Sequence, residues 1–225
     1  MTAAVSRSTL VAFIAAMAFV VVVSNVLVQF PVQAMIGSYN LADLLTYGAF
    51  TYPIAFLVND LTNRRFGPSK ARIVVGFGFV LAVICSATIP PLLFSLGLFP
   101  FEMTSGRLLR IAIASGTAFL IAQLLDVFVF DRLRGGQWWK APLFSTFVGS
   151  VLDTVLFFSL AFATSFAFLG AGDEFATEAA PFLGLFAIEA PRWISWAVGD
   201  FGVKVLVGLA LLIPYGVIAR RPAVA

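Results

Sequence analysis

Long apolar runs dominate this sequence and limit the folds that are open to it. A helix needs about 20 apolar residues to cross a bilayer, and six segments meet or nearly meet that length. They are residues 9–30, 41–59, 73–94, 108–130, 142–168 and 193–218. The chain is 61% hydrophobic, well above a soluble domain. We therefore predict an all-α, polytopic membrane protein, with residues 1–225 forming a single integral membrane domain built as a six-transmembrane-helix bundle.

The basic residues predict the orientation of this bundle. If the N-terminus is cytoplasmic, ten of the fourteen Lys and Arg residues fall in cytoplasmic segments: Arg7, Arg64, Arg65, Lys70, Arg72, Arg132, Arg134, Lys140, Arg220 and Arg221. The external segments then hold Arg107, Arg110 and Arg192 together with Glu102, Asp173, Glu174, Glu178 and Glu189. The positive-inside rule predicts both termini in the cytoplasm (N-in/C-in). The first run is longer than a signal-peptide core, so we expect it to be kept as a helix.

Composition argues against several kinds of site. The chain has no histidine, and its one cysteine, Cys85, lies within an apolar run. A thiolate metal site or a disulfide framework cannot be built from one cysteine. The sequence has no Gly-rich phosphate loop and no nucleophile with a histidine base. The basic residues lie in short segments rather than on one face. We expect no enzyme activity, no metal, no cofactor and no nucleic-acid partner.

Four charged residues lie inside the apolar runs: Asp126, Asp153, Asp200 and Lys204. A charge at membrane depth costs a few kcal/mol, about 2.5 to 3.5 at a helix centre on insertion scales, so it needs a partner, a water-filled cavity or a ligand. Asp153 follows Pro142 by eleven residues, which places it about 16 Å into the bilayer. These charges favour an intramembrane substrate or ion pathway, and buried structural pairs remain the alternative.

The spacing of the polar residues leaves some partners open. Asp200 and Lys204 are four residues apart and can pair on one helix, or Lys204 can offer its charge to Asp153. Gln123 and Asp126 are three apart and share a face, although Asp126 can also be read as reaching the membrane interface.

Other polar and small residues interrupt the apolar runs. Asn25 in the first run can both donate and accept hydrogen bonds. Asp60 follows the second run, where an ion pair with Arg64 at i+4 is a strong alternative to a functional role. Glycines predicted to permit close helix contacts, and so also to allow a homodimer, are Gly76, Gly78, Gly202 and Gly208.

Several segments carry a resemblance to a known family. These are SNVLVQFPV, TYGAFTYPIAFLVNDLTNRRFGPSKAR, AQLLDVFVFDRLR, WWKAPLFSTFVGSVLDTVLFFSLAF and GDFGVKVLVGLALLIPYGV. The chain resembles the queuosine precursor transporter family, also called the vitamin uptake transporter family, over nearly all six runs. The resemblance implies uptake of 7-cyano-7-deazaguanine across the bacterial inner membrane, for making the tRNA nucleoside queuosine. The 7-aminomethyl relative is a second candidate substrate.

The resemblance and the residues together suggest a site. Its substrate-binding candidates are Asn25, Gln123, Asp126, Asp153 and Lys204, and its candidates for a coupling or structural charge are Asp60 and Asp200. In this hypothesis Asp153 accepts the adjacent ring N–H and amino donors of the deazapurine, Gln123 or Asn25 meets its carbonyl, and a Phe or Tyr stacks on the ring. The alternatives are a binding subunit of an energy-coupling-factor vitamin importer and an intramembrane lipid-modifying enzyme.

Overall fold

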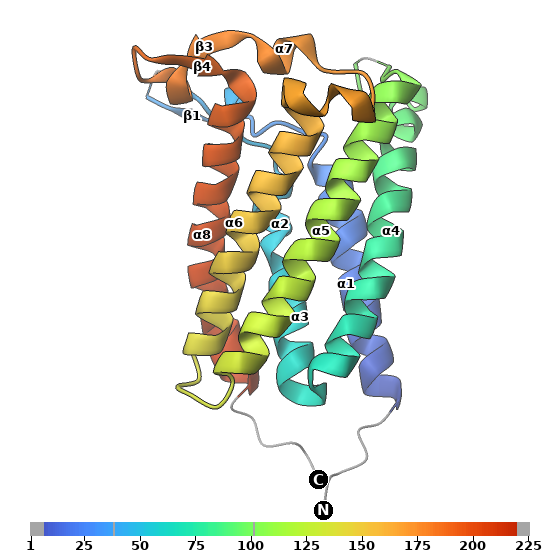
Figure 1. The fold of residues 1–225 in the computed structure, drawn as a ribbon, viewed down its shortest axis with the longest axis vertical. Coiled ribbons are helices and arrows are strands. Elements are labelled where there is room, and N and C mark those ends of the chain that lie inside the picture. Colours follow the sequence, from blue (N-terminus) through green and yellow to red (C-terminus); the bar gives the residue numbers. More distant parts are fainter. Residues whose placement is uncertain (1–6, 38, 101, 220–225) are drawn as a thin grey trace, which may run out of the picture.

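Five long helices run side by side along the long axis of the bundle in the computed structural model (Figure 1). They are α1 (Arg7–Leu27), α4 (Pro68–Ser95), α5 (Ser105–Leu133), α6 (Lys140–Phe162) and α8 (Arg192–Ala219). The structure describes residues 7–37, 39–100 and 102–219. Within them, these five helices are long and apolar enough to cross a membrane. The expected multi-pass, mostly helical membrane protein is confirmed.

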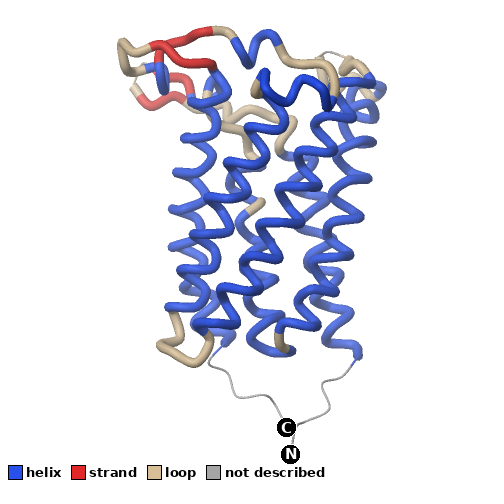
Figure 2. Tube along the Cα trace, viewed as in Figure 1, coloured by secondary structure: helices blue, strands red, loops and turns tan. Residues whose placement is uncertain are grey.

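The second expected span, residues 41–59, is not one continuous helix. A 3-10 turn, η1 (Leu41–Asp43), is followed by α2 (Gly48–Thr51) and α3 (Pro53–Phe66). Pro53 has no N–H to donate to the preceding turn, so the helical hydrogen-bond ladder is interrupted at Tyr52, although the dihedral angles of Tyr52 (φ −57°, ψ −39°) stay helical. Figure 2 shows a short non-helical piece inside the bundle. The predicted count of six spanning helices is therefore not confirmed.

Helix α3 lies in the centre of the bundle and packs against α1, α4, α5, α6 and α8. Its second half carries Asn59, Asp60, Thr62 and Asn63, each at most 1% exposed. Polar side chains are tolerated here because neighbouring helices surround them and supply hydrogen-bond partners. Gly67, with φ of 82°, ends α3, and the proline that follows it begins α4.

Short elements gather at one end of the bundle, at the top of Figures 1 and 2. They are β1 (Met35–Ile36), β2 (Tyr39–Asn40), η2 (Thr164–Leu169), α7 (Glu174–Thr177), β3 (Ala179–Pro181), η3 (Phe182–Gly184) and β4 (Glu189–Pro191). Strands β1 and β2 pair antiparallel, as do β3 and β4. These two small sheets are a departure from the all-α prediction. They form because their ladders satisfy backbone N–H and C=O groups in the loops.

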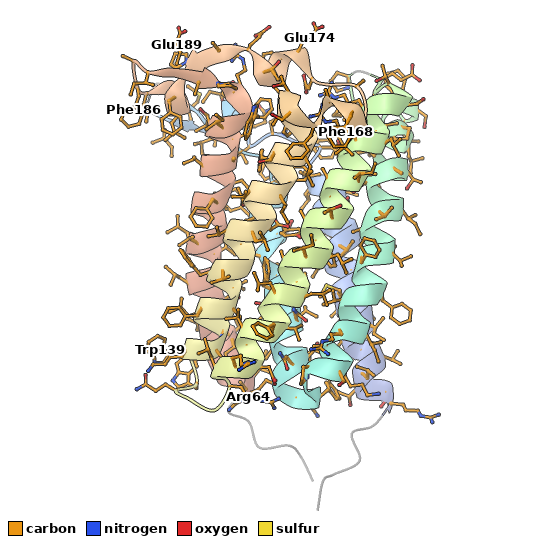
Figure 3. The ribbon with its side chains drawn as sticks, viewed as in Figure 1. Arg64, Trp139, Phe168, Glu174, Phe186 and Glu189 are labelled. Atoms are coloured by element: carbon orange, nitrogen blue, oxygen red, sulfur yellow. The ribbon has the colours of Figure 1, made fainter. Side chains whose placement is uncertain are left out.

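Charge is divided between the two ends of the bundle as the sequence predicts. Arg64 lies at the end where α1 begins and α8 ends, whereas Glu174 and Glu189 lie at the opposite end (Figure 3). We call these the basic end and the acidic end. Arg220 and Arg221 fall outside the described residues. The basic end is the cytoplasmic side in the predicted orientation, which stays a prediction.

Arg110 differs from its expected place in an external segment. It lies in α5 and is 1% exposed. Its guanidinium donates from Nε to the carbonyl of Leu160 at 2.9 Å and from Nη2 to that of Ala163 at 2.6 Å. The positive charge therefore stabilises the carboxyl end of α6, where backbone carbonyls lack helical partners.

The four candidate packing glycines divide into two groups. A Cβ added at Gly78 would lie 2.8 Å from the Phe119 ring, and one at Gly208 would lie 3.3 Å from Thr146 Cγ2, so both permit close helix contacts. A Cβ at Gly76 or Gly202 would meet nothing within 4 Å. The packing prediction is confirmed for the first two and wrong for the others, which face open space.

Gly48 gives a sharper test of helix packing, because a Cβ there would lie 2.8 Å from the backbone Cα of Val28. Gly48→Ala forces backbone to shift, and we expect it to lower stability by about 1–3 kcal/mol. The measurement is the thermal unfolding midpoint of purified protein in detergent. Gly76→Ala is the matched control and should leave the midpoint nearly unchanged. Equal losses in both variants would contradict the packing argument.

Candidate functional site

Three charged side chains from two helices meet in the interior. Lys204 Nζ on α8 lies 2.7 Å from Asp153 Oδ2 on α6 and 2.5 Å from Asp200 Oδ2, one turn away on its own helix. We call Asp153, Asp200 and Lys204 the charge triad. The side chains of Asp153 and Lys204 are about 5% exposed, and that of Asp200 is 17% exposed. Lys204 therefore pairs with both carboxylates. The sequence had left Asp200 and Asp153 as alternative partners, and the structure shows both contacts.

Two neutral residues complete the hydrogen bonds of the triad. Tyr52 Oη donates to Asp153 Oδ1 at 2.8 Å, so both oxygens of that carboxylate are occupied. Thr154 Oγ1 donates to Asp200 Oδ2 at 3.1 Å and accepts from Lys204 Nζ at 3.2 Å. The ammonium thus has three oxygen neighbours, which matches its three donors.

Tyr52 occupies the interruption between α2 and α3, and its ring lies within a group of aromatic side chains. Its ring centroid is 6.1 Å from that of Phe56 and 6.3 Å from that of Phe119, both in edge-to-face geometry. Lys204 Nζ lies 5.2 Å from the Tyr52 centroid, within reach of a cation–π interaction. The junction of α2 and α3 therefore places aromatic rings beside the triad.

Two more carboxyl groups lie nearer the basic end, on α3 and α5. Asp60 and Asp126 are 1% and 0% exposed and within reach of each other. We call them the carboxyl pair. The Ser145 hydroxyl on α6 donates to Asp60 Oδ1 at 3.1 Å and also lies against Asp126. Thr146 Oγ1 donates to Asp60 Oδ2 at 3.3 Å.

The structure excludes two alternatives that the sequence left open for the carboxyl pair, an ion pair between Asp60 and Arg64 and a position of Asp126 at the membrane interface. Asp60 forms no ion pair with Arg64, whose guanidinium instead donates to the carbonyl of Arg134 at 2.9 Å. Asp126 does not reach the interface, because it is buried and its Oδ2 accepts from Asn59 Nδ2 at 2.8 Å.

Several buried polar atoms have no hydrogen-bond partner among the described residues. Those near the site are Asn59 Oδ1, Asn63 Oδ1, Asp126 Oδ1, Ser150 Oγ and both amide atoms of Gln123. The other two are Nε atoms of Arg107 and Arg192, away from the site. Gln123 precedes Asp126 by one turn on α5, and Ser150 precedes Asp153 by one turn on α6. An unsatisfied buried polar group costs about 1–3 kcal/mol, so a bound ligand or water at these groups would be favourable.

Asn25 belongs to a separate polar group. Its Oδ1 accepts from Ser86 Oγ at 2.9 Å, and its Nδ2 donates to the Val21 carbonyl at 2.9 Å. Nearby, Ser24 Oγ donates to Thr51 Oγ1 at 3.0 Å, one residue before Tyr52. The structure therefore does not place Asn25 in contact with the charge triad. The neighbouring Ser24 is linked to the triad only indirectly, through Thr51 and the adjacent Tyr52.

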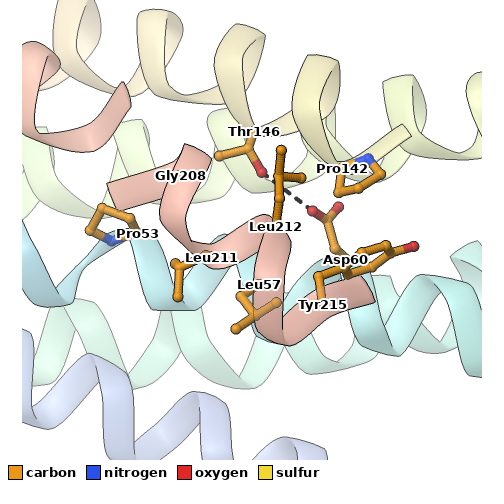
Figure 4. Close-up of a pocket in the computed structure, with 9 residues that line it drawn as sticks. All are labelled: Pro53, Leu57, Asp60, Pro142, Thr146, Gly208, Leu211, Leu212 and Tyr215. Carbon is orange, nitrogen blue, oxygen red and sulfur yellow. Dashed lines mark hydrogen bonds between the residues drawn. The ribbon is translucent and has the colours of Figure 1, made fainter. Parts of the chain in front are cut away.

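A small cavity opens beside the carboxyl pair, between α3, α6 and α8 (Figure 4). Its lining includes Asp60, Thr146, Gly208 and Tyr215. The volume is about 10 Å³, close to the least that admits one water molecule. This space is far too small for a nucleobase-sized solute, so a solute could pass here only if the helices separated.

Sequence reasoning found most of these groups but missed Tyr52, which holds Asp153, and Asn59, which holds Asp126. The signal for Tyr52 was the proline directly after it in an apolar run, since a proline there frees backbone and marks an interruption. Asn59 stands beside Asp60 at the polar end of the second run, but sequence spacing could not pair it with Asp126 on another helix.

The fold and the buried charges define a polytopic helical membrane protein with polar groups within its span. A family model described as "Putative vitamin uptake transporter" matches residues 46–218. The chain is 36% identical over 212 residues to a "Probable queuosine precursor transporter" of Haemophilus influenzae, which covers 89% of this chain and 82% of that protein. It is 35% identical over 204 residues to the "Queuosine precursor transporter" of Escherichia coli, covering 88% and 81%.

A third relative, a "Probable queuosine precursor transporter" of Bacillus subtilis, is 27% identical over 187 residues, which is 78% of this chain and 72% of that protein. The comparison with solved structures gives no match. The chain belongs to the vitamin uptake transporter family. It is a transporter and not an enzyme, which excludes the lipid-modifying alternative.

Proposed function

We propose that this protein imports 7-cyano-7-deazaguanine, a precursor of queuosine, across the bacterial inner membrane. The names of three relatives support a queuosine precursor as the substrate. The observation that carries the proposal is the buried Asp153 carboxylate, with the unpartnered Gln123 amide and Ser150 hydroxyl on the same two helices, α5 and α6. In this proposal α2 and α3 form a sixth crossing, and both termini are cytoplasmic.

The chemistry of the substrate suits these groups. A deazaguanine presents a ring N–H and an exocyclic amino group side by side, and one carboxylate can accept both. Its ring carbonyl then needs a donor, which the Gln123 amide can supply. The flat ring can stack on the aromatic group around Tyr52 and Phe56, since base–aromatic stacking contributes about 1–3 kcal/mol.

Binding at Asp153 involves an exchange of partners. Asp153 now holds Tyr52 and Lys204, so the substrate must displace one or both of them. Lys204 keeps Asp200 as a counter-charge when it leaves Asp153. The substrate therefore replaces one or both of these hydrogen bonds with its own, and in this proposal the exchange lets α3 and α8 move relative to α6.

Uptake into proteoliposomes that contain only the purified protein tests the function. Radiolabelled 7-cyano-7-deazaguanine should enter these vesicles, and excess unlabelled substrate should abolish the signal. Guanine is the comparison solute. Uptake only after an ATPase partner is added would favour the binding subunit of an energy-coupling-factor importer, and no uptake or binding under either condition would contradict the proposal.

Gln123 offers a test that separates binding from folding. Its amide is 0% exposed and unpartnered, so Gln123→Met should leave the thermal unfolding midpoint unchanged or raise it. Substrate affinity should fall by about tenfold or more, because one hydrogen bond to a buried carbonyl is lost. Gln33→Met, the same change in an exposed loop, should alter neither. Unchanged affinity in Gln123→Met would remove this residue from the site.

A further inference from the structure

From the sequence, Asp126 is a substrate-binding candidate and Asp60 a coupling candidate, but the substrate contacts proposed at Asp153 and Gln123 use neither carboxyl group. Both members of the carboxyl pair are buried, and neither has a cationic partner among the described residues. Ion pairs in the described part of the chain go to Asp131, Asp153, Asp173, Glu178 and Asp200. None goes to Asp60 or Asp126. Two negative charges side by side in a low dielectric repel each other strongly, so such a pair favours holding one proton between its members.

The hydrogen bonds around the pair fit a shared proton. Asp60 already accepts from Ser145 and Thr146, and Asp126 accepts from Asn59. Asp126 Oδ1 is left without a donor. Two ionised carboxylates can only accept, whereas a proton on one of them turns their contact into a donor–acceptor hydrogen bond.

The other titratable groups around the pair leave it without a neutralising charge. Tyr215 on α8 lines the cavity that reaches Asp60. Asp131 and Arg134 pair with each other at 3.1 Å. Exposed basic residues at this end of the bundle are Arg7 on α1, Arg64 and Arg65 on α3, Lys70 and Arg72 on α4, Arg132 on α5 and Lys140 on α6.

The same two helices join the carboxyl pair to the charge triad. Tyr52 directly precedes α3 and lies eight residues, about 12 Å, before Asp60. On α6, Thr146 lies seven residues, about 11 Å, before Asp153. A movement of α3 against α6 that changes the Tyr52–Asp153 contact therefore also changes the contacts of Asp60 with α6.

We propose that Asp60 and Asp126 together form the proton site that couples substrate import to a proton gradient. This rests on the proposed function. The pair takes up one proton from the external side while the basic end is closed. With that proton shared, the pair holds α3, α5 and α6 together and keeps the basic end closed. When substrate occupies Asp153 and the helices shift, the proton leaves to cytoplasmic water. The two bare carboxylates then repel, which opens this end and releases the substrate. The cavity beside Asp60 has room for the single water that can carry the proton.

Proteoliposomes with the membrane potential held at zero test this proposal with radiolabelled 7-cyano-7-deazaguanine. One proton per substrate predicts about tenfold accumulation for each pH unit, acid outside. Asp60→Asn and Asp126→Asn should abolish this accumulation but keep exchange of labelled for unlabelled substrate at equal pH. Asp131→Asn, the same change at a surface ion pair, should accumulate substrate as the native protein does.

The outcomes separate this inference from the function itself. Exchange without gradient-driven accumulation in the native protein would overturn proton coupling and leave the import function standing. Accumulation that persists in both variants would overturn the assignment to this pair. Absence of exchange and of binding in the native protein would instead contradict the import function.

A measurement without substrate addresses the site directly, and it serves if the single variants fold poorly. Infrared spectra of the native protein in lipid at neutral pH should contain the C=O stretch of a protonated carboxyl group. The Asp60→Asn, Asp126→Asn double variant should lack it, and Asp131→Asn should keep it. A native spectrum without this band would show that the pair holds no proton and would overturn the proposal.

Discussion

Lys204→Met will destabilise the protein more than the loss of either carboxylate of the charge triad. The substitution removes the cation that lies between Asp153 and Asp200 and leaves two carboxylates in the interior with no counter-charge. Removing one partner of a buried ion pair costs about 3–5 kcal/mol. The loss of the contact to Thr154 Oγ1 adds to this cost. Since whole proteins are stable by only about 5–15 kcal/mol, we expect little folded protein in the membrane.

The measurements are the folded fraction in detergent by size-exclusion chromatography and the thermal unfolding midpoint. Lys140→Met removes a lysine from an exposed position and should change stability by no more than about 0.5 kcal/mol. Adding Asp200→Asn to Lys204→Met removes one unpaired carboxylate and should restore a large part of the lost stability. If Lys204→Met were as stable as the native protein, the triad could not be held together as described.

Most of the bundle could be predicted because apolar run length alone decides where a helix crosses. The last run, residues 193–218, differs from α8 by one residue at each end. The segment at α3 could not be predicted in the same way. Its second half is polar, so a search for apolar runs ended at Asn59, whereas the helix continues to Phe66. Only packing against five neighbouring helices makes that polar helix stable in the interior.

The candidate site shows the same division between local and distant information. The pairing of Lys204 with Asp200 could be predicted from their spacing on one helix. Asp153 could be predicted as a site residue from its depth in the bilayer. The pairing of Asp60 with Asp126 joins residues far apart in the sequence and depends on how α3 packs against α5. Local spacing left Arg64 open as an alternative partner of Asp60, and the structure does not form this pair, because the Arg64 guanidinium donates to the Arg134 carbonyl.

Asp153→Asn is expected to abolish import while the protein still folds. The variant keeps the Lys204–Asp200 ion pair, so no charge in the triad is left without a partner. It loses the carboxylate that is proposed to accept two donors from the substrate. An asparagine offers one acceptor and one amino group, and the amino group opposes a substrate donor. Two charge-assisted hydrogen bonds contribute about 1.5–3 kcal/mol each, so affinity should fall by about 100-fold or more.

Two measurements test the loss of affinity and import. One is equilibrium binding of radiolabelled 7-cyano-7-deazaguanine to purified protein, and the other is uptake in a strain that cannot make its own precursor. Asp200→Asn keeps the Asp153 carboxylate and should reduce affinity much less. Asp131→Asn should behave as the native protein, because Asp131 pairs only with Arg134 at the surface. Full uptake by a folded Asp153→Asn variant would show that the substrate is held elsewhere. The unpartnered Gln123 amide and Ser150 hydroxyl would then have to bind the substrate without a carboxylate. Such a neutral site would have far less preference for a solute with adjacent N–H and amino donors.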